Sequence, residues 1–197
     1  MDALSAREQK LLLSALDMGA QKTADYLSKL SQEPWKCTAS SIYHNFATPL
    51  FSTFPESDKP YWSAYLPLQD GIPLGVHMIM SPDSVALLGQ AWSKNYRQVG
   101  ASAQFPPQDV VKEISNIVAH GFCGELGELF STLLILSVPE ISEGNRRNLI
   151  EQGFKKVDGA NLLVVSNVVM SKSDFTIRCE LYFYAGAEMI KLFLRGN

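Results

Sequence analysis

The chain has 197 residues, of which 46% are hydrophobic and 19% charged, a balance typical of a globular protein rather than a disordered one. The formal net charge of −3 and the lack of any long basic cluster argue against nucleic-acid binding. No apolar run approaches the roughly 20 residues of a membrane-spanning helix, and the N-terminus lacks the pattern of a signal peptide. We therefore expect no membrane insertion.

The cysteines and histidines give little sign of metal or redox chemistry. Cys37, Cys123 and Cys179 are odd in number and widely spaced, which predicts reduced, buried thiols in a reducing compartment. The three histidines are scattered too, and no spacing of Cys and His suggests a metal cage. The sequence therefore predicts a cytoplasmic protein that binds no metal or other cofactor of its own.

The N-terminal region predicts a long helix followed by a strand. Apolar residues recur at helical spacing from residue 6 to about residue 31, and Pro34 closes that helix. The β-branched and aromatic residues within 35–50 favour a strand, and a polar connection follows over 51–60.

A hairpin is predicted next, with strands over 61–69 and 72–80 flanking the tight-turn pair Asp70-Gly71. Proline cannot donate a hydrogen bond to a neighbouring strand. Pro67 and Pro73 therefore indicate strands that are interrupted or lie at a sheet edge.

Two helices are predicted next, in the middle of the chain. Ser81-Pro82-Asp83 combines an N-cap, a first-turn proline and a favourable acid, and predicts a helix to about Ser93. The second half restarts at Pro106-Pro107 with a helical pattern that reaches about Phe130. The apolar run STLLILSVP, residues 131–139, predicts a strand after it.

The C-terminal region predicts two more strands. A polar stretch over 140–159 ends in the turn Val157-Asp158-Gly159, and strand-like runs follow over 160–170 and 175–184. A short helix over roughly 186–194 completes the pattern.

A shift of 99 residues aligns the two long helices of the chain. The matched apolar positions, which we expect to be buried, are Leu11, Ala15, Met18, Leu27 and Leu30 with Val110, Ile114, Ile117, Leu126 and Leu129. Any two amphipathic helices can align in this way, but the repeated order of helix, three strands and helix favours duplication. The sequence thus predicts one α+β domain over 1–197, with pseudo-two-fold halves at 6–98 and 105–197 and a long antiparallel sheet packed by the helices.

One polar stripe in the second long helix is a candidate functional site. Asp109, Glu113, Asn116 and His120 occupy positions i, i+4, i+7 and i+11 and share one helix face. Every amphipathic helix has a polar face, so a solvated surface is the simplest interpretation of the pattern. Asn is nevertheless a mediocre residue in the middle of a helix.

The stripe also resembles a known family signature. Asp109, Glu113 and Asn116 form D-x-x-x-E-x-x-N, and Pro139 follows after 22 residues. This spacing is similar to the signature of the CheC/CheX/FliY phosphatases of bacterial chemotaxis. The segment EISNIVAHGF resembles the motif helix of that family. The segment LSKL before Pro34 resembles the end of the corresponding helix in the first half of family members.

The resemblance implies a phosphatase for the phosphoaspartate of a CheY-like receiver domain. It implies that Asn116 orients the attacking water and that Glu113 pairs with the active-site lysine of the receiver. Asp109 would support docking or helix geometry, and Pro139 would end the strand after the helix. His120 departs from the family pattern, which has a small residue there; it could contact the bound receiver, but a surface or half-buried histidine is the more ordinary interpretation. The Mg²⁺ for the reaction would lie on the receiver, and a CheD-like protein or a second copy of the chain are further candidate partners.

The first long helix departs from the family pattern. Ser14 and Asp17 stand where the alignment with Glu113 and Asn116 would require Glu and Asn, so this first site is predicted to be inactive. The alternative function is a non-catalytic module of the same fold that binds receivers or flagellar-switch components on the same helix. A third interpretation is a degenerate family member that interacts with an unrelated partner.

Three glycines lie in the second long helix after the motif. Gly121, Gly124 and Gly127 recur every three residues, and each costs up to about 1 kcal/mol relative to Ala in a helix interior. They predict that another backbone approaches this helix closely. We expect that backbone to be the first long helix, which offers the small side chains of Ala20 and Ala24 at the contact. Cys123, within this run, is interpreted as a small core residue rather than a nucleophile.

Overall fold

The structure, a computed structural model, describes residues 4–45, 59–69, 72–97, 105–172 and 175–195. Within these ranges the chain forms five helices and one six-stranded antiparallel sheet. The elements in chain order are α1 (Ala6–Ser31), β1 (Lys36–Asn45), β2 (Tyr61–Pro67), β3 (Leu74–Met80), α3 (Pro82–Arg97), α4 (Pro107–Leu129), β4 (Glu140–Gly144), α5 (Arg146–Lys155), β5 (Leu162–Lys172), β6 (Phe175–Ala185) and α6 (Ala187–Arg195). The predicted α+β class is confirmed.

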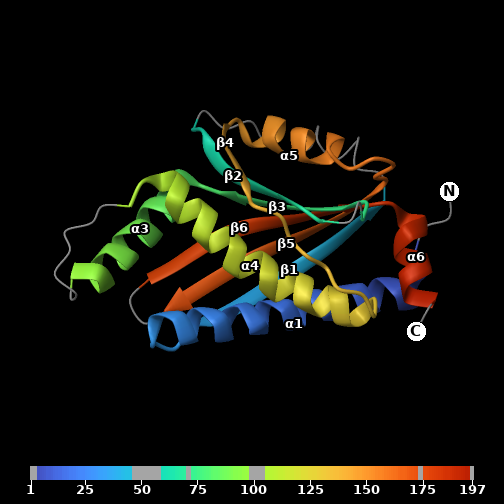
Figure 1. The fold of residues 1–197 in the computed structure, drawn as a ribbon, viewed down its shortest axis with the longest axis horizontal. Coiled ribbons are helices and arrows are strands. Elements are labelled where there is room, and N and C mark those ends of the chain that lie inside the picture. Colours follow the sequence, from blue (N-terminus) through green and yellow to red (C-terminus); the bar gives the residue numbers. More distant parts are fainter. Residues whose placement is uncertain (1–3, 46–58, 70–71, 98–104, 173–174, 196–197) are drawn as a thin grey trace.

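The sheet is covered by α1 and α4 on one face, while α5 packs on the other (Figure 1). Side chains alternate between the faces of a strand, so one strand can serve both layers. In β6, Leu181 and Phe183 join the main core beneath α1 and α4, whereas Tyr182 and Tyr184 join a smaller core beneath α5. These two cores cover the two faces of the sheet.

The strand order is β1-β5-β6-β3-β2-β4. Exchanging β1 with β4, β2 with β5 and β3 with β6 gives the same order reversed, as a two-fold relation between the halves requires. The long helices obey the same relation. A Cβ on Gly19 would lie 2.7 Å from the Cα of Phe122, and the Thr23 hydroxyl lies 3.5 Å from the carbonyl oxygen of Val118. A 99-residue shift interchanges these two contacts, so α1 and α4 cross antiparallel about a pseudo-two-fold axis. A common origin of the halves stays a prediction.

The strand predicted directly after α4 is wrong. Residues 131–139 form no strand and contribute only an isolated bridge, Leu68 to Leu136. The third strand of the second half is instead β4, and α5 follows it; the sequence pattern predicted neither element within the polar stretch 140–159. Among the described strands β4 pairs with β2 alone. Such an edge strand can be polar, and its polar sequence resembles that of a loop.

The predicted buried stripe of α1 is also partly wrong. Leu11, Met18 and Leu30 are exposed, whereas Leu12 and Leu16 are buried. The buried face is rotated by about one residue because α1 packs against both the sheet and α4.

The predicted hairpin is confirmed, since β2 pairs antiparallel with β3, although its turn residues 70–71 lie outside the described ranges. Its strands are interior rather than at an edge. Pro67 is the last residue of β2 and Pro73 precedes β3, so neither interrupts a strand. The strand predicted over 35–50 is β1, and residues 46–50 and most of the 51–60 connection lie outside the described ranges.

Candidate functional site

The motif helix α4 begins at a proline and carries the first motif residue in its first turn. Pro106 is the N-cap and offers no side-chain cap hydrogen bond, while Pro107 occupies the first helical position. Asp109 follows in the first turn, where a negative charge is favourable beside the positive end of the helix dipole. The position of Asp109 thus supports a role in helix geometry.

The three motif residues and His120 share the outward side of α4. The side chains of Asp109, Glu113 and His120 are exposed, and that of Asn116 is half-buried. With a rise of 1.5 Å per residue, Glu113 and Asn116 are separated by about 4.5 Å along the helix axis. No hydrogen bond or ion pair links the side chains of Glu113 and Asn116 to other residues in the described part of the chain. One partner surface can therefore reach both groups.

His120 is tied to the backbone of the catalytic candidate one turn before it. Its Nδ1 lies 2.7 Å from the carbonyl oxygen of Asn116. A carbonyl oxygen only accepts hydrogen bonds, so Nδ1 carries the proton and donates it. The other ring nitrogen, Nε2, remains available on the exposed face, where it can meet a partner.

The crossing with α1 fixes the position of α4. A Cβ on Gly121 would lie 2.3 Å from the Oγ1 of Thr23 and 2.9 Å from the carbonyl oxygen of Gly19. The close approach predicted from the glycines is therefore confirmed at Gly121, but it involves Gly19 and Thr23 rather than Ala20 and Ala24. Gly124 is exposed.

The third glycine serves a different contact. A Cβ on Gly127 would lie 2.8 Å from the carbonyl oxygen of Thr132, in the chain that leaves α4. The prediction that this glycine meets the first helix is therefore wrong.

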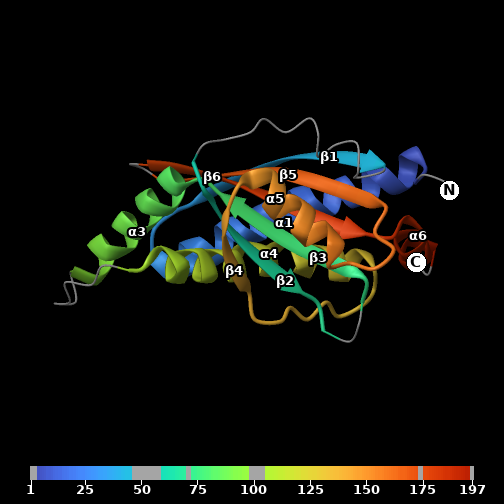
Figure 2. The same ribbon diagram turned by 90° about the horizontal axis from the view of Figure 1, so that it is seen from above.

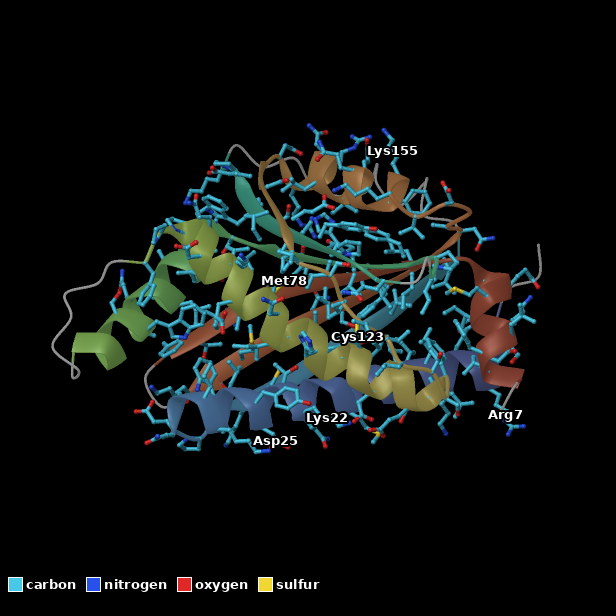
Figure 3. All side chains as sticks on the ribbon, in the orientation of Figure 1. Arg7, Lys22, Asp25, Met78, Cys123 and Lys155 are labelled. Carbon is cyan, nitrogen blue, oxygen red and sulfur yellow. The ribbon has the colours of Figure 1, made fainter. Side chains whose placement is uncertain are left out.

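An ion pair bridges the two helices beside the crossing. The ammonium of Lys22, labelled on α1 in Figure 3, lies 2.6 Å from a carboxylate oxygen of the buried Glu125 and 2.9 Å from one of Glu128. Hydrogen bonds to Glu125, and then to Glu128, raise the pKa of Lys22 above its ordinary value. This charge pairing holds α4 against α1 one turn beyond His120.

Cys123 lies in the core, as expected. It is 2% exposed, and burial raises the pKa of its thiol to about 12, which disfavours the nucleophilic thiolate. In the described ranges no three His, Cys, Asp or Glu side chains form a group that could hold a metal ion. None of the described helices is long and apolar enough to cross a membrane.

The pseudo-equivalent face on α1 is an exposed polar surface. Lys10, Ser14, Asp17 and Gln21 are all exposed. Asp17 would place a carboxylate where Asn116 places a neutral amide, and the Ser14 side chain is much shorter than that of Glu113. Only α4 carries the motif residues.

The segment after α4 contributes exposed apolar side chains that the sequence did not reveal. Leu133 is 77% exposed and Val138 is 71% exposed. An apolar run of this length is the ordinary signal of a buried strand, so the pattern alone could not predict exposure. Pro139 is buried and precedes β4 rather than ending a strand.

Comparison with solved structures identifies the fold. FliY from Thermotoga maritima has a TM-score of 0.71 and 14% identity, with 98% of this chain and 96% of that chain covered. The middle domain of FliM from H. pylori gives a TM-score of 0.58 and 10% identity over 98% of this chain and all of that chain. A chain of the FliG–FliM complex from H. pylori gives 0.56 and 12%, covering 95% and 98%.

The chain adopts a CheC/CheX/FliY-like fold. A scan against models of protein families finds no match, and a search of curated proteins finds none either. At these identities the likeness extends to the CheC/CheX/FliY-like fold alone. The spacing of Asp109, Glu113, Asn116 and Pro139 is separate information, because it comes from the sequence.

Proposed function

We propose that the chain is a phosphatase that accelerates hydrolysis of the phosphoaspartate of a CheY-like receiver domain. The observation that carries the proposal is the location of the Glu-x-x-Asn motif. Glu113 and Asn116 lie one turn apart on the outward side of α4, in a fold like that of FliY. Their spacing to Pro139 resembles the signature of the family phosphatases.

The proposed reaction asks the chain to position a water rather than to form a covalent bond. Water attacks phosphorus in line, the bond from phosphorus to the aspartyl oxygen breaks, and inorganic phosphate and the free carboxylate result. Phosphoryl transfer depends mainly on positioning and charge stabilisation, and the receiver supplies its own Mg²⁺ and lysine. The Asn116 amide can donate to and accept from the water without adding negative charge near the phosphoryl group.

Glu113 is proposed to fix the docking geometry. Its exposed carboxylate can pair with the active-site lysine of the receiver, and it makes no ion pair with a described residue that would have to break first. The contacts between α4 and α1 matter for the positioning of Asn116. Asn116 can orient a water only if its helix does not shift, and the Gly121 crossing and the Lys22 ion pair hold it in place.

The test follows the loss of phosphate from each of the host's receiver domains after phosphorylation with acetyl phosphate and Mg²⁺. The wild-type protein should accelerate the decay of at least one receiver, and Asn116→Ala should lose about a hundredfold, or about 2.7 kcal/mol of barrier lowering. Glu113→Ala should mainly raise the KM for the receiver. Asp17→Ala, the matched change on α1, should leave the rate unaltered.

Two outcomes would contradict the proposal. Unaltered decay of every receiver in the presence of the wild-type protein would exclude phosphatase activity. Equal acceleration by wild type and Asn116→Ala would exclude the role given to the amide.

The second candidate is a non-catalytic module that binds a receiver or a flagellar-switch component through this fold. It is favoured by the structural likeness to the FliM middle domain and to a chain of the FliG–FliM complex. Binding that survives Asn116→Ala, without any change in phosphate loss, would support this candidate, because docking alone requires no amide there. A CheD-like partner, a homodimer and a cytoplasmic location stay predictions.

A further inference from the structure

Backbone hydrogen bonds anchor the segment that follows α4 at its start and along its middle. At its start, the backbone N–H of Thr132 donates to the carbonyl oxygen of Gly127 at 2.9 Å. In its middle, the N–H of Gln69 donates to the Ile135 oxygen and the N–H of Ser137 to the Pro67 oxygen, both at 2.8 Å. These bonds hold the segment against the end of β2.

Its apolar side chains point in two directions. Leu134 and Leu136 pack against the main core, whereas Leu133, Ile135 and Val138 are 77%, 39% and 71% exposed. We call these three exposed side chains the apolar ridge. Because the backbone beneath it is hydrogen-bonded, the ridge is a fixed surface whose apolar area meets water in the isolated chain.

The helix line on which Asn116 lies leads to the segment that carries the ridge. The segment runs back along α4 on the side opposite α1, as Figures 1 and 2 both show. Cys123 and Gly127 follow Asn116 at i+7 and i+11 and so lie on nearly the same line of the helix. Both are buried, and Gly127 is covered by Thr132 of the segment.

The motif face is too small to be a docking surface by itself. From Asp109 to His120 it is about 16 Å long and one helix wide, roughly 160 Å². Specific interfaces bury about 800 Å² on each partner. A receiver that reaches Glu113 and Asn116 must therefore also cover an adjoining surface. The polar flank on α1 offers Ser14, Asp17 and Gln21, whereas the other flank offers the ridge.

We infer that the apolar ridge is the second half of the receiver-docking surface and is covered by apolar side chains of the bound CheY-like receiver. This inference rests on the proposed function, since that function places the receiver on α4. It predicts that the ridge contributes to the affinity for the receiver, whereas Asn116 contributes to the rate of hydrolysis in the bound complex.

The test compares wild type with the double variant Leu133→Ser/Val138→Ser. Leu192→Ser on α6 is a matched control, because Leu192 is as exposed as Val138, at 71%. Initial rates of phosphate loss are measured against the concentration of each receiver, phosphorylated with acetyl phosphate and Mg²⁺. The ridge variant should raise KM about tenfold or more with kcat within about twofold of wild type, and the control should change neither. Far-UV circular dichroism and melting verify that both variants fold.

A direct titration separates this inference from the proposed function. If the wild-type protein binds a phosphorylated receiver but hydrolyses nothing, the phosphatase proposal fails, and weaker binding by the ridge variant still supports the ridge. Equal binding by wild type and ridge variant overturns the inference, as does the absence of binding to any receiver. A wild-type dimer that the ridge variant converts to a monomer would also overturn it, because the occupant would then be a second copy of the chain.

Discussion

At the scale of single residues, the proposed site on α4 can be compared with the corresponding face of α1. Asp17 and Asn116 occupy corresponding positions, and their side chains are nearly isosteric. Asp17 is exposed and Asn116 is half-buried. The carboxylate would repel an anionic phosphoryl group, whereas the amide can hold a water beside it. The difference that we propose to matter is therefore one of charge rather than of shape.

A buried histidine away from the motif makes the stability of the protein depend on pH. His77 on β3 is 3% exposed, and its Nδ1 lies 3.2 Å from the Tyr184 hydroxyl. That hydroxyl donates to the Ile150 carbonyl oxygen, so Nδ1 is the donor to it. Burial, and then the positive charge of Lys156, lower the pKa of His77 from 6.5 to about 3.

Because the folded-state pKa is lowered, the unfolded chain gains a proton at His77 before the folded chain does. The contribution to stability is complete above pH 6.5 and is lost as the pH falls from 6.5 towards 3. We expect the free energy of unfolding to fall by up to about 1.4 kcal/mol per pH unit in this window. Urea unfolding at several pH values between 7.5 and 4.5 measures the slope.

The variant His77→Gln removes the titrating group while keeping a donor for Tyr184, so it should flatten this slope. His120→Gln is the control, since His120 is exposed. The interpretation fails if both variants keep the wild-type slope, or if His120→Gln alone removes it.

At the scale of elements, the crossing of α1 and α4 predicts that Gly→Ala changes the stability of the protein in opposite directions at two glycines of α4. In a helix interior, Gly→Ala is ordinarily favourable by about 1 kcal/mol. A Cβ at Gly121, however, would lie 2.3 Å from the Thr23 Oγ1 and 3.0 Å from its backbone nitrogen. At Gly124 the nearest atom is the Lys22 Nζ at 4.0 Å, which is ordinary contact.

We therefore predict that Gly121→Ala destabilises the protein by about 1–3 kcal/mol, because the helices must move apart. Gly124→Ala should stabilise it by up to about 1 kcal/mol. Urea midpoints at constant m-value measure both changes. Stabilisation by Gly121→Ala would mean that the helices do not approach as closely as the structure shows.

The sequence predicted those elements whose local signals agree with their packing. α1, α4, β5, β6 and the β2–β3 hairpin all appear where periodicity and turn residues placed them. The motif stripe on α4 was likewise predictable, because helical spacing fixes which residues share a face.

The failures arose where tertiary contacts overrode the pattern. Residues 131–139 have the composition of a strand, yet β2 already pairs with β4 and β3, so only one bridge remains for the segment. Similarly, the face of α1 that is buried depends on where α4 crosses it, and no pattern within α1 contains that information. Exposure of the apolar ridge could not be predicted for the same reason.

At the scale of the whole molecule, the two halves are interleaved rather than adjacent. β5 and β6 of the second half lie between β1 and β3 of the first, and β4 of the second half pairs with β2 of the first. Neither half alone retains a continuous sheet. Separation of the halves would also expose the faces of α1 and α4 that pack together. We therefore expect a single cooperative unfolding transition in spite of the internal repeat.

The three cysteines provide a direct measurement of that cooperativity. Cys37 belongs to the first half, on the edge strand β1, whereas Cys123 and Cys179 belong to the second. All three are buried, and burial raises the pKa of the Cys37 and Cys123 thiols to about 12 and that of Cys179 as well. Because the thiolate is the reactive form, a thiol reagent should modify none of them at an appreciable rate in the native state.

In increasing urea the three thiols should become reactive together, at the midpoint of the far-UV circular dichroism transition. Brief labelling followed by mass spectrometry of the peptides distinguishes the sites. Reactivity of Cys37 at clearly lower urea than that of Cys179 would show that the first half, or its edge strand, opens independently. Fraying limited to β1 would leave the helical signal unchanged, whereas separate unfolding of the first half would also remove the signal of α1. Coincident labelling would show that duplication, if it built this fold, produced one folding unit from two sequences.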